Sequence, residues 1–152
     1  MTVRTPLVLL GILANGFAQS ASPAPVTFAV HVLVPCSTPG AGQPVRFAGV
    51  DAALCLDGTP FLTQKDVRSA ELRQNSQGHP VVFLTLRESA AIRELEVTRK
   101  NIGHRVGILV NGQVVAVPTV MASSRFVYIA ANYTAKQAQE LVDAFNKLAG
   151  NR

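Results

Sequence analysis

Residues 78–118 read GHPVVFLTLRESAAIRELEVTRKNIGHRVGILVNGQVVAVP, and this unbroken run predicts a strand, a helix and a hairpin in that order. The strand is expected over 80–86, where valine, leucine and phenylalanine concentrate, and the helix over 88–102. Asn111 and Gly112 are the strongest short hairpin signal in the chain, because their turn needs positive φ at both positions. The valine-rich runs on either side of that turn are therefore expected to pair.

Two helices are predicted, and each carries an apolar stripe. The stripe of the first helix consists of Ala91, Leu95, Thr98 and Ile102. Thr134 and Gln137 form a capping-box pattern that opens the last helix. The stripe of that helix consists of Ala138, Leu141, Val142, Phe145 and Leu148. Both helices are therefore expected to pack against a sheet.

The remaining strands complete the pattern of an α+β fold. Residues 26–34 alternate and are rich in β-branched side chains, and 126–130 forms a further short strand. Residues 67–74 are expected to pair with 80–86 through a turn at 75–78. We predict a mostly antiparallel sheet with two helices packed on one face, ferredoxin-like in character.

The first residues have the outline of a secretory signal. Their apolar run is shorter than the roughly 20 residues that a membrane span needs, and small residues follow it. We predict a signal peptide over 1–20, cleaved after Ser20, a linker over 21–27 and a single domain over 28–152. An uncleaved membrane anchor is the alternative. The expected location is periplasmic or secreted, with no integral membrane span after cleavage.

The charge balance argues against nucleic acid as a partner. The chain has 14 Lys and Arg against 9 Asp and Glu, a net charge of +5. The basic residues are dispersed, however, and Arg99 and Lys100 are the only adjacent pair. A dispersed excess of this kind is typical of a soluble surface, whereas a phosphate backbone selects a continuous basic stripe.

Cys36 and Cys55 flank a segment rich in proline and glycine. In an exported chain these two cysteines are expected to form a disulfide. Closing a loop of about 20 residues would stabilise the fold by about 3 kcal/mol. Two free, buried thiols are the alternative. A metal site is not expected, because His31 has no second ligand at a suitable spacing.

Catalytic patterns are weak throughout the sequence. The three histidines lie in a predicted strand and beside two turns, and none has a nucleophile at triad-like spacing. Glu88, Glu94 and Glu96 share one helix with basic residues, a pattern more typical of solvated ion pairs than of an acid–base pair. We therefore expect no catalytic residues, no cofactor and no enzyme activity. An enzyme with an unrecognised site is the less favoured alternative.

Several of these segments resemble one family. The order of a PVV strand, a helix ending in TRKNIG, a GILV strand, an NG turn and a V-x-x-P exit is similar to the head subdomain of the first periplasmic domain of SecD. An L-T-x-x-D-[LV] step precedes a strand in that family, and Leu62, Thr63, Asp66 and Val67 stand in those places. The resemblance covers 54–149.

The chain departs from the family pattern at two places. Glu94 stands where the family helix usually carries an aromatic side chain, which implies that Ile92 and Leu95 take over the packing there. Residues 121–124 replace a glycine-rich turn. The membrane helices that couple proton flow to export in SecD are not seen in this sequence, so the resemblance implies a head-like module and not the motor.

The resemblance implies a non-catalytic module that binds polypeptide or an envelope protein, with a link to protein export. An accessory subunit of an unrelated envelope complex is the alternative. An exposed strand edge offers one physical route, since it can accept an extended peptide as an added strand. The expected partner-binding residues are Val115, Val117, Val120, Met121, Arg125 and Phe126. Packing of the valines in the core is the competing interpretation.

Overall fold

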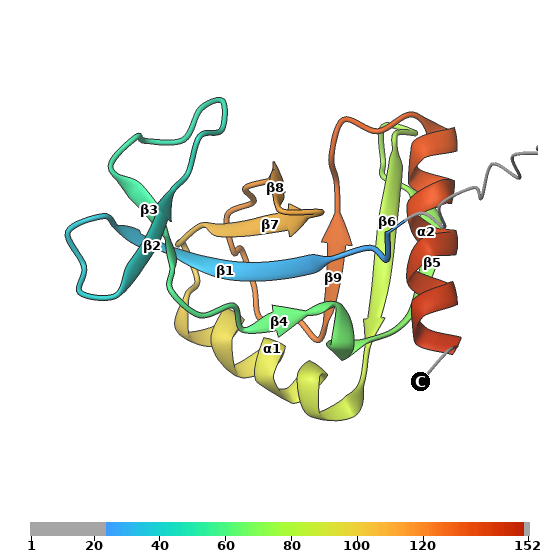
Figure 1. Ribbon diagram of the computed structural model, residues 1–152, viewed down its shortest axis with the longest axis horizontal. Coiled ribbons are helices and arrows are strands. Elements are labelled where there is room, and N and C mark those ends of the chain that lie inside the picture. Colours follow the sequence, from blue (N-terminus) through green and yellow to red (C-terminus); the bar gives the residue numbers. More distant parts are fainter. Residues whose placement is uncertain (1–23, 151–152) are drawn as a thin grey trace, which may run out of the picture.

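The computed structural model describes residues 24–150, which fold into two antiparallel sheets and two α-helices (Figure 1). The elements in chain order are β1 (Phe28–Pro35), β2 (Ala41–Pro44), β3 (Leu54–Asp57), β4 (Leu62–Thr63), a 3-10 turn η1 (Gln64–Asp66), β5 (Val67–Gln74), β6 (Pro80–Leu86), α1 (Glu88–Lys100), β7 (Val106–Val110), β8 (Gln113–Ala116), β9 (Phe126–Ile129) and α2 (Ala135–Gly150). The predicted signal peptide lies outside the described residues, as do residues 21–23 of the predicted linker.

The first sheet is built around β1. Its strand order is β2-β3-β1-β7-β8, and β4 also pairs with β1. Val30 of β1 lies opposite Ile108 of β7 on one side and Leu62 of β4 on the other. All three side chains are buried. The β7–β8 hairpin closes through Asn111 and Gly112, whose φ angles are 51° and 77°, as the sequence predicts.

The second sheet has three strands in the order β5-β6-β9, and α2 lies along β5 and β6 (Figure 1). The α+β class is therefore confirmed, but the strands divide between two sheets instead of forming the single sheet expected from the sequence. The reason lies in the core, because an inner face of each sheet packs on the same buried cluster. Alternation within a strand indicates that one face is buried and does not identify the strand's partner.

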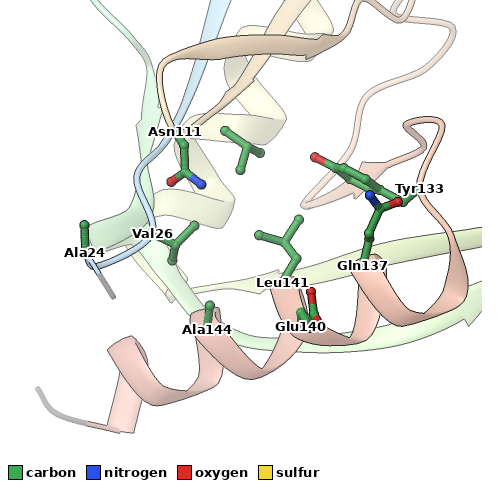
Figure 2. A pocket seen from close by; sticks show the side chains of 9 residues that line it. Ala24, Val26, Asn111, Tyr133, Gln137, Glu140, Leu141 and Ala144 are labelled. Carbon is green, nitrogen blue, oxygen red and sulfur yellow. The ribbon is translucent and has the colours of Figure 1, made fainter. Parts of the chain in front are cut away.

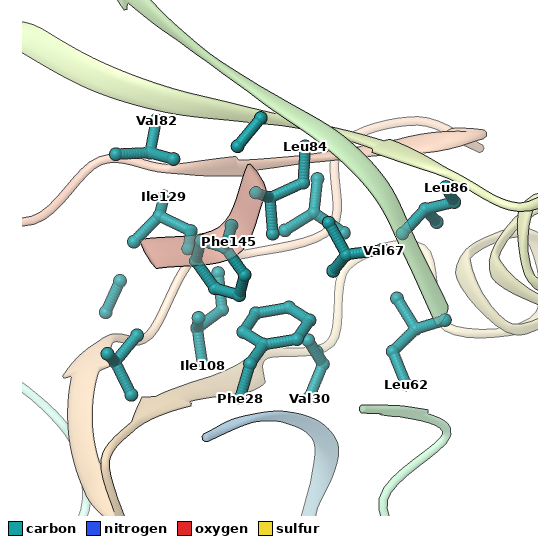
Figure 3. Close-up of a cluster of buried hydrophobic side chains, with 14 of the residues drawn as sticks. Phe28, Val30, Leu62, Val67, Val82, Leu84, Leu86, Ile108, Ile129 and Phe145 are labelled. Carbon is teal, nitrogen blue, oxygen red and sulfur yellow. The ribbon is translucent and has the colours of Figure 1, made fainter. Parts of the chain in front are cut away.

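The main core lies between the two sheets and α2 (Figure 3). Phe28 of β1 meets Phe145 of α2 edge to face, with ring centroids 5.7 Å apart. Leu84 of β6 and Ile129 of β9 are fully buried beside them. Burying such side chains contributes about 1.5–3 kcal/mol each, so this cluster accounts for much of the stability of the fold.

Helix α2 begins as the sequence predicts. The backbone N–H of Thr134 donates to the side chain of Gln137, and the N–H of Gln137 donates to the Thr134 hydroxyl, at 2.9 and 3.2 Å. The predicted stripe is also confirmed: Ala138, Val142 and Phe145 are buried, and the two leucines pack half-buried against the core.

Helix α1 buries part of the stripe that the sequence predicts: Ala91 and Thr98 are buried, whereas Ile102 lies beyond the end of the helix. The exposed fraction is 54% at Ile102 and 46% at Ile92, while Glu94 is only 5% exposed. The expectation that Ile92 and Leu95 replace the family's aromatic side chain is therefore wrong for Ile92, and Leu95 is only half-buried. Glu94 itself occupies the inner position. Arg93 fixes α1 to the segment before β5, because its guanidinium donates to Phe61 O at 2.6 Å and pairs with Asp66 at 2.7 Å.

The predicted disulfide between Cys36 and Cys55 is present, with an S–S distance of 2.07 Å. It joins the end of β1 to β3 and closes the loop that carries β2. A small second core, Leu33, Val45 and Leu56, lies in the same part of the fold. Neither α-helix within residues 24–150 is long and apolar enough to span a membrane.

Candidate functional site

The solvent-facing side of the three-stranded sheet carries three aromatic rings. Phe83 of β6 lies directly opposite Tyr128 of β9, and Phe126 lies two residues before Tyr128 on the same side. The ring centroids are 4.9–5.3 Å apart in all three pairs. Side chains alternate along a strand, so the residues between these rings point to the core. We call Phe83, Phe126, Tyr128 and the adjacent Arg73 the aromatic face.

Arg73 of β5 completes the aromatic face. Its guanidinium carbon lies 3.5 Å from the centre of the Phe83 ring, a cation–π contact. Glu71 accepts hydrogen bonds from Arg73 Nε and Nη2 at 3.2 and 3.0 Å. The hydrogen bond to the Glu71 carboxylate raises the pKa of Arg73 above its usual value. The pair therefore keeps a charged, planar group stacked on the ring.

Two of the three rings, Phe126 and Tyr128, are exposed to solvent, and Phe83 is half-buried. The exposed fraction is 41% at Phe126 and 44% at Tyr128, and Met121, in the loop before β9, is 81% exposed. Scattered exposed apolar residues are common, whereas adjacent aromatic rings on one sheet face indicate an interaction surface. The aromatic face is therefore the strongest candidate site among the residues that the structure describes.

A shallow groove of about 400 Å³ borders the aromatic face and leads to the start of α1. Its lining residues are Arg68, Phe83, Thr85, Leu86, Glu88, Ala91, Arg125 and Phe126. Its lining combines apolar side chains with charged side chains from β5, α1 and the residue before β9.

The structure separates the six predicted partner-binding residues into two groups. Val120 is buried in the main core, Val115 packs against that core, and Val117 packs against the second core. These three valines therefore serve packing. Arg125 and Phe126 line the groove, and Met121 is open to solvent. A role in partner binding for this second group remains a prediction.

The sequence alone did not identify Phe83, Tyr128 and Arg73 as site residues. The available signal was the run of large apolar residues in 80–86 and 126–129, in which every residue except Thr85 is apolar or aromatic. Such runs indicate a strand buried on both faces. Only the pairing of β6 with β9 shows that the aromatic residues of both strands lie on the same, outer side.

The loop before β9 is fixed by hydrogen bonds to α1. The Thr98 hydroxyl donates to Glu94 O at 2.7 Å and accepts from the backbone N–H of Ser124 at 2.9 Å. The Ser124 hydroxyl in turn donates to Phe126 O at 2.7 Å and accepts from Phe126 N–H at 3.2 Å. These bonds place Arg125 and Phe126 at the rim of the groove.

On each edge strand of the three-stranded sheet, one residue has its backbone N–H and C=O groups bonded to a side chain. On β5, the Asn146 side chain accepts from Ala70 N–H at 2.8 Å and donates to Ala70 O at 2.9 Å, as a paired strand would. On β9, the Ser124 hydroxyl bonds both polar backbone groups of Phe126. Strand addition needs these groups unpaired. The contacts thus favour binding across the face over binding along these edges.

Glu94 is a buried carboxyl group close to this loop anchor. Burial raises its pKa to about 7, and its Oε2 atom has no hydrogen-bond partner. Within residues 24–150 no three acidic, histidine or cysteine side chains are grouped as a metal site would require. Glu94 therefore lies on the inner face of α1, and burying its carboxyl group lowers the stability of the fold.

A second groove lies between α2 and the residues that lead into β1 (Figure 2). It has a volume of about 280 Å³. Its lining residues are Ala24, Val26, Val110, Asn111, Tyr133, Gln137, Glu140, Leu141 and Ala144. Burial raises the pKa of the Tyr133 phenol, which keeps it a neutral hydrogen-bonding group at neutral pH. The groove offers amide, phenol and apolar contacts.

The fold and the aromatic face define a small α+β module of two antiparallel sheets with aromatic side chains on the outer face of one sheet. The sequence model of the SecDF P1 head subdomain family matches residues 44–147, and the chain belongs to that family. The protein translocase subunit SecD of Acidaminococcus fermentans is 32% identical over 65 residues, which are 43% of this chain and 16% of that protein.

Two further relatives match over similar segments. SecD of Aquifex aeolicus is 30% identical over 87 residues, 57% of this chain and 17% of the relative. SecDF of Thermus thermophilus is 38% identical over 63 residues, 41% of this chain and 9% of the relative. The chain thus matches less than a fifth of the length of each of these relatives.

Solved structures share the fold. A structure of SecDF, described as a membrane component that enhances protein export, superposes with a TM-score of 0.61 at 21% identity, over 80% of this chain and 62% of that one. The structure of SecDF from Thermus thermophilus, described as a translocon-associated membrane protein, gives a TM-score of 0.52 at 20% identity, over 82% and 20%. These likenesses confirm the α+β architecture predicted from the sequence.

Proposed function

We propose that this chain is an exported, non-catalytic module that takes part in protein export by binding extended polypeptide on its aromatic face. Membership of the SecDF P1 head family supports the link to export. The observation that carries the binding proposal is the mutually packed set of Phe83, Phe126 and Tyr128 on the outer side of the sheet, in which Phe126 and Tyr128 are exposed and Phe83 is half-buried.

The chemistry of the aromatic face suits a sequence-tolerant partner. Aromatic rings bury a large apolar area at a low cost in side-chain entropy, and they accept apolar side chains of many shapes. Arg73 is held over Phe83 by Glu71, so little further ordering is needed when a ligand arrives. An open face with few anchoring groups favours weak and reversible contacts, as binding of a polypeptide during its export requires.

The proposed location is the periplasm or the cell exterior. The apolar N-terminal residues support export, and the Cys36–Cys55 disulfide suits an oxidising compartment. The proposed partner is an unfolded exported polypeptide. An accessory role toward a single envelope protein would use the same face, and the experiment below separates the two.

The test is photocrosslinking in the native cell from a photoreactive residue at position 126 and, separately, at position 121. A photoreactive residue in place of Arg99, an exposed position on α1, is the matched control. We expect many unrelated exported proteins to be captured from 126 and 121 and not from 99, and we expect Phe83→Ser to reduce the yield from both.

Capture of one defined envelope protein in constant stoichiometry would replace the export proposal with the accessory role. Equal capture from all three positions, or none from any of them, would remove the aromatic face as the binding surface.

A further inference from the structure

Two arginines that form no ion pair with any residue of 24–150 lie on opposite sides of the groove. Arg68 lies at an irregularity in β5, between Val67 and Ser69, and Arg125 immediately precedes β9. Between them runs β6, where Thr85 lies opposite Ser69 on one side and Phe126 on the other. Neighbouring strands are about 4.8 Å apart, so the outer strands of the sheet are separated by about 10 Å.

The charged residues at this surface differ in whether they form ion pairs. Glu71 is bound to Arg73 and leaves no net charge at that pair. Glu88 also lines the groove and forms no ion pair with any residue of 24–150. Arg68 and Arg125 are likewise unpaired. The groove therefore has two free cationic groups and one free carboxylate, and it carries net positive charge.

We propose that this groove selects, among extended polypeptides, segments in which an aspartate or glutamate neighbours an aromatic or large apolar residue. The inference rests on the proposed function and names the ligand chemistry. The apolar side chain packs on Phe83 and Phe126, and the acidic side chain is bound by Arg68 or Arg125 as the segment runs between them. A guanidinium is planar and weakly hydrated, and it binds a carboxylate through two parallel hydrogen bonds.

Glu88 opposes the two arginines, and the balance of the three charges determines whether acidic or basic segments bind more tightly. A lysine or arginine at the same place in the ligand would meet Glu88, but it would also meet two like charges. Exposed ion pairs each contribute modestly and are screened by salt. The preference is therefore expected to be graded, with acidic segments above neutral ones and neutral ones above basic ones.

The test measures the affinity of the full chain for three end-blocked peptides by fluorescence anisotropy at low ionic strength. The peptides share one Phe-Leu core, which is flanked by glutamate, by glutamine or by lysine. We expect the glutamate peptide to bind about three- to tenfold more tightly than the glutamine peptide, and the lysine peptide to bind most weakly. About 0.5 M salt should remove most of the difference.

Protein variants assign the effect to the two arginines. The double variant Arg68→Gln/Arg125→Gln is expected to bind the glutamate and glutamine peptides equally and to leave the affinity for the glutamine peptide unchanged. Arg99→Gln removes one charge from an exposed position on α1 and serves as the control. It should keep the preference.

The outcomes separate this inference from the proposed function. If all three peptides bind equally and Phe126→Ser abolishes binding, polypeptide binding stands and the charge selection is wrong. If no peptide binds, both proposals fail. If the chain binds phosphatidylglycerol vesicles through Arg68 and Arg125 and shows no preference among the peptides, the groove contacts a membrane surface and the inference is overturned.

Discussion

The inner and outer faces of the three-stranded sheet carry apolar side chains of similar size in opposite environments. Leu84 of β6 and Ile129 of β9 point inward and are fully buried, while Phe126 and Tyr128 of β9 point outward and are more than two fifths exposed. The inner face gains the whole burial energy on folding, and the outer face gains only part of it. Apolar area left open in this way contributes little to stability, which is why we assign the outer face to binding.

The largest expected effect breaks the inner face. Leu84→Ala removes a fully buried side chain from the main core, and such changes cost about 2–5 kcal/mol. We expect this loss in the free energy of unfolding, measured by urea denaturation. An effect below about 1 kcal/mol would mean that the core is not organised around the sheet as described.

The disulfide lies in another part of the fold and should affect stability without affecting binding. Cys36 and Cys55 are 19 residues apart, and opening a loop of this length is expected to cost about 3 kcal/mol. Cys36→Ser/Cys55→Ser should lower the unfolding free energy by that amount. At temperatures where the variant remains folded, crosslinking from position 126 should be unchanged. A parallel loss of crosslinking would show that the disulfide region supports the aromatic face.

Glu94 is a buried polar group, and its ionisation should make the stability of the inner side depend on pH. Its pKa is about 7 in the folded chain and 4.5 in the reference state. The folded state therefore binds more protons between these values, and stability falls as the pH rises from 4.5 through 7. The difference of about 2.5 pKa units corresponds to about 3 kcal/mol at pH 8.

Unfolding of the wild type and Glu94→Gln should be compared at pH 5 and pH 8. The wild type is expected to lose up to about 3 kcal/mol between the two, and the variant, which cannot ionise at this position, much less. Glu96→Gln, an exposed neighbour on α1, is the control and should behave like the wild type. An identical pH dependence in Glu94→Gln would contradict the burial of an ionisable carboxyl group.

The smallest expected effect on stability belongs to the outer face. Tyr128→Ser removes an exposed ring, and surface substitutions usually change the unfolding free energy by about 0.5 kcal/mol or less. Loss of the contact with Phe83 adds about 0.5–1 kcal/mol. A cost comparable to that of Leu84→Ala would mean that the ring is structural, and the distinction between the two faces would fail.

The two helices show how much of the fold the sequence contains. Helix α2 has a strong apolar stripe and a capping box, so both its start and its buried face are predicted correctly. In α1, Ala91 and Thr98 of the predicted stripe are buried, but Ile102 lies beyond the end of the helix and is exposed, and Glu94 takes an inner position that the apolar pattern does not predict. Apolar periodicity shows neither where the helix ends nor that a carboxyl group faces the core.

The candidate site was predictable only in part for a similar reason. Arg125, Phe126 and Met121 were found because they follow a predicted hairpin and lie near each other in sequence. Phe83 joins them only through the pairing of β6 with β9, more than 40 positions apart in the chain. The turn at Asn111 and Gly112, by contrast, depends on two adjacent residues and was predicted in full.

The most direct test of the central claim compares one variant of each face in a single binding experiment. The affinity of the full chain for an unfolded polypeptide, and its unfolding free energy, should be measured for Phe126→Ser/Tyr128→Ser and for Ile129→Val. We predict that the outer-face variant loses at least about tenfold in affinity with little loss of stability. The inner-face variant should lose about 0.5–1.5 kcal/mol of stability with its affinity unchanged. Unchanged affinity in the outer-face variant would contradict the claim.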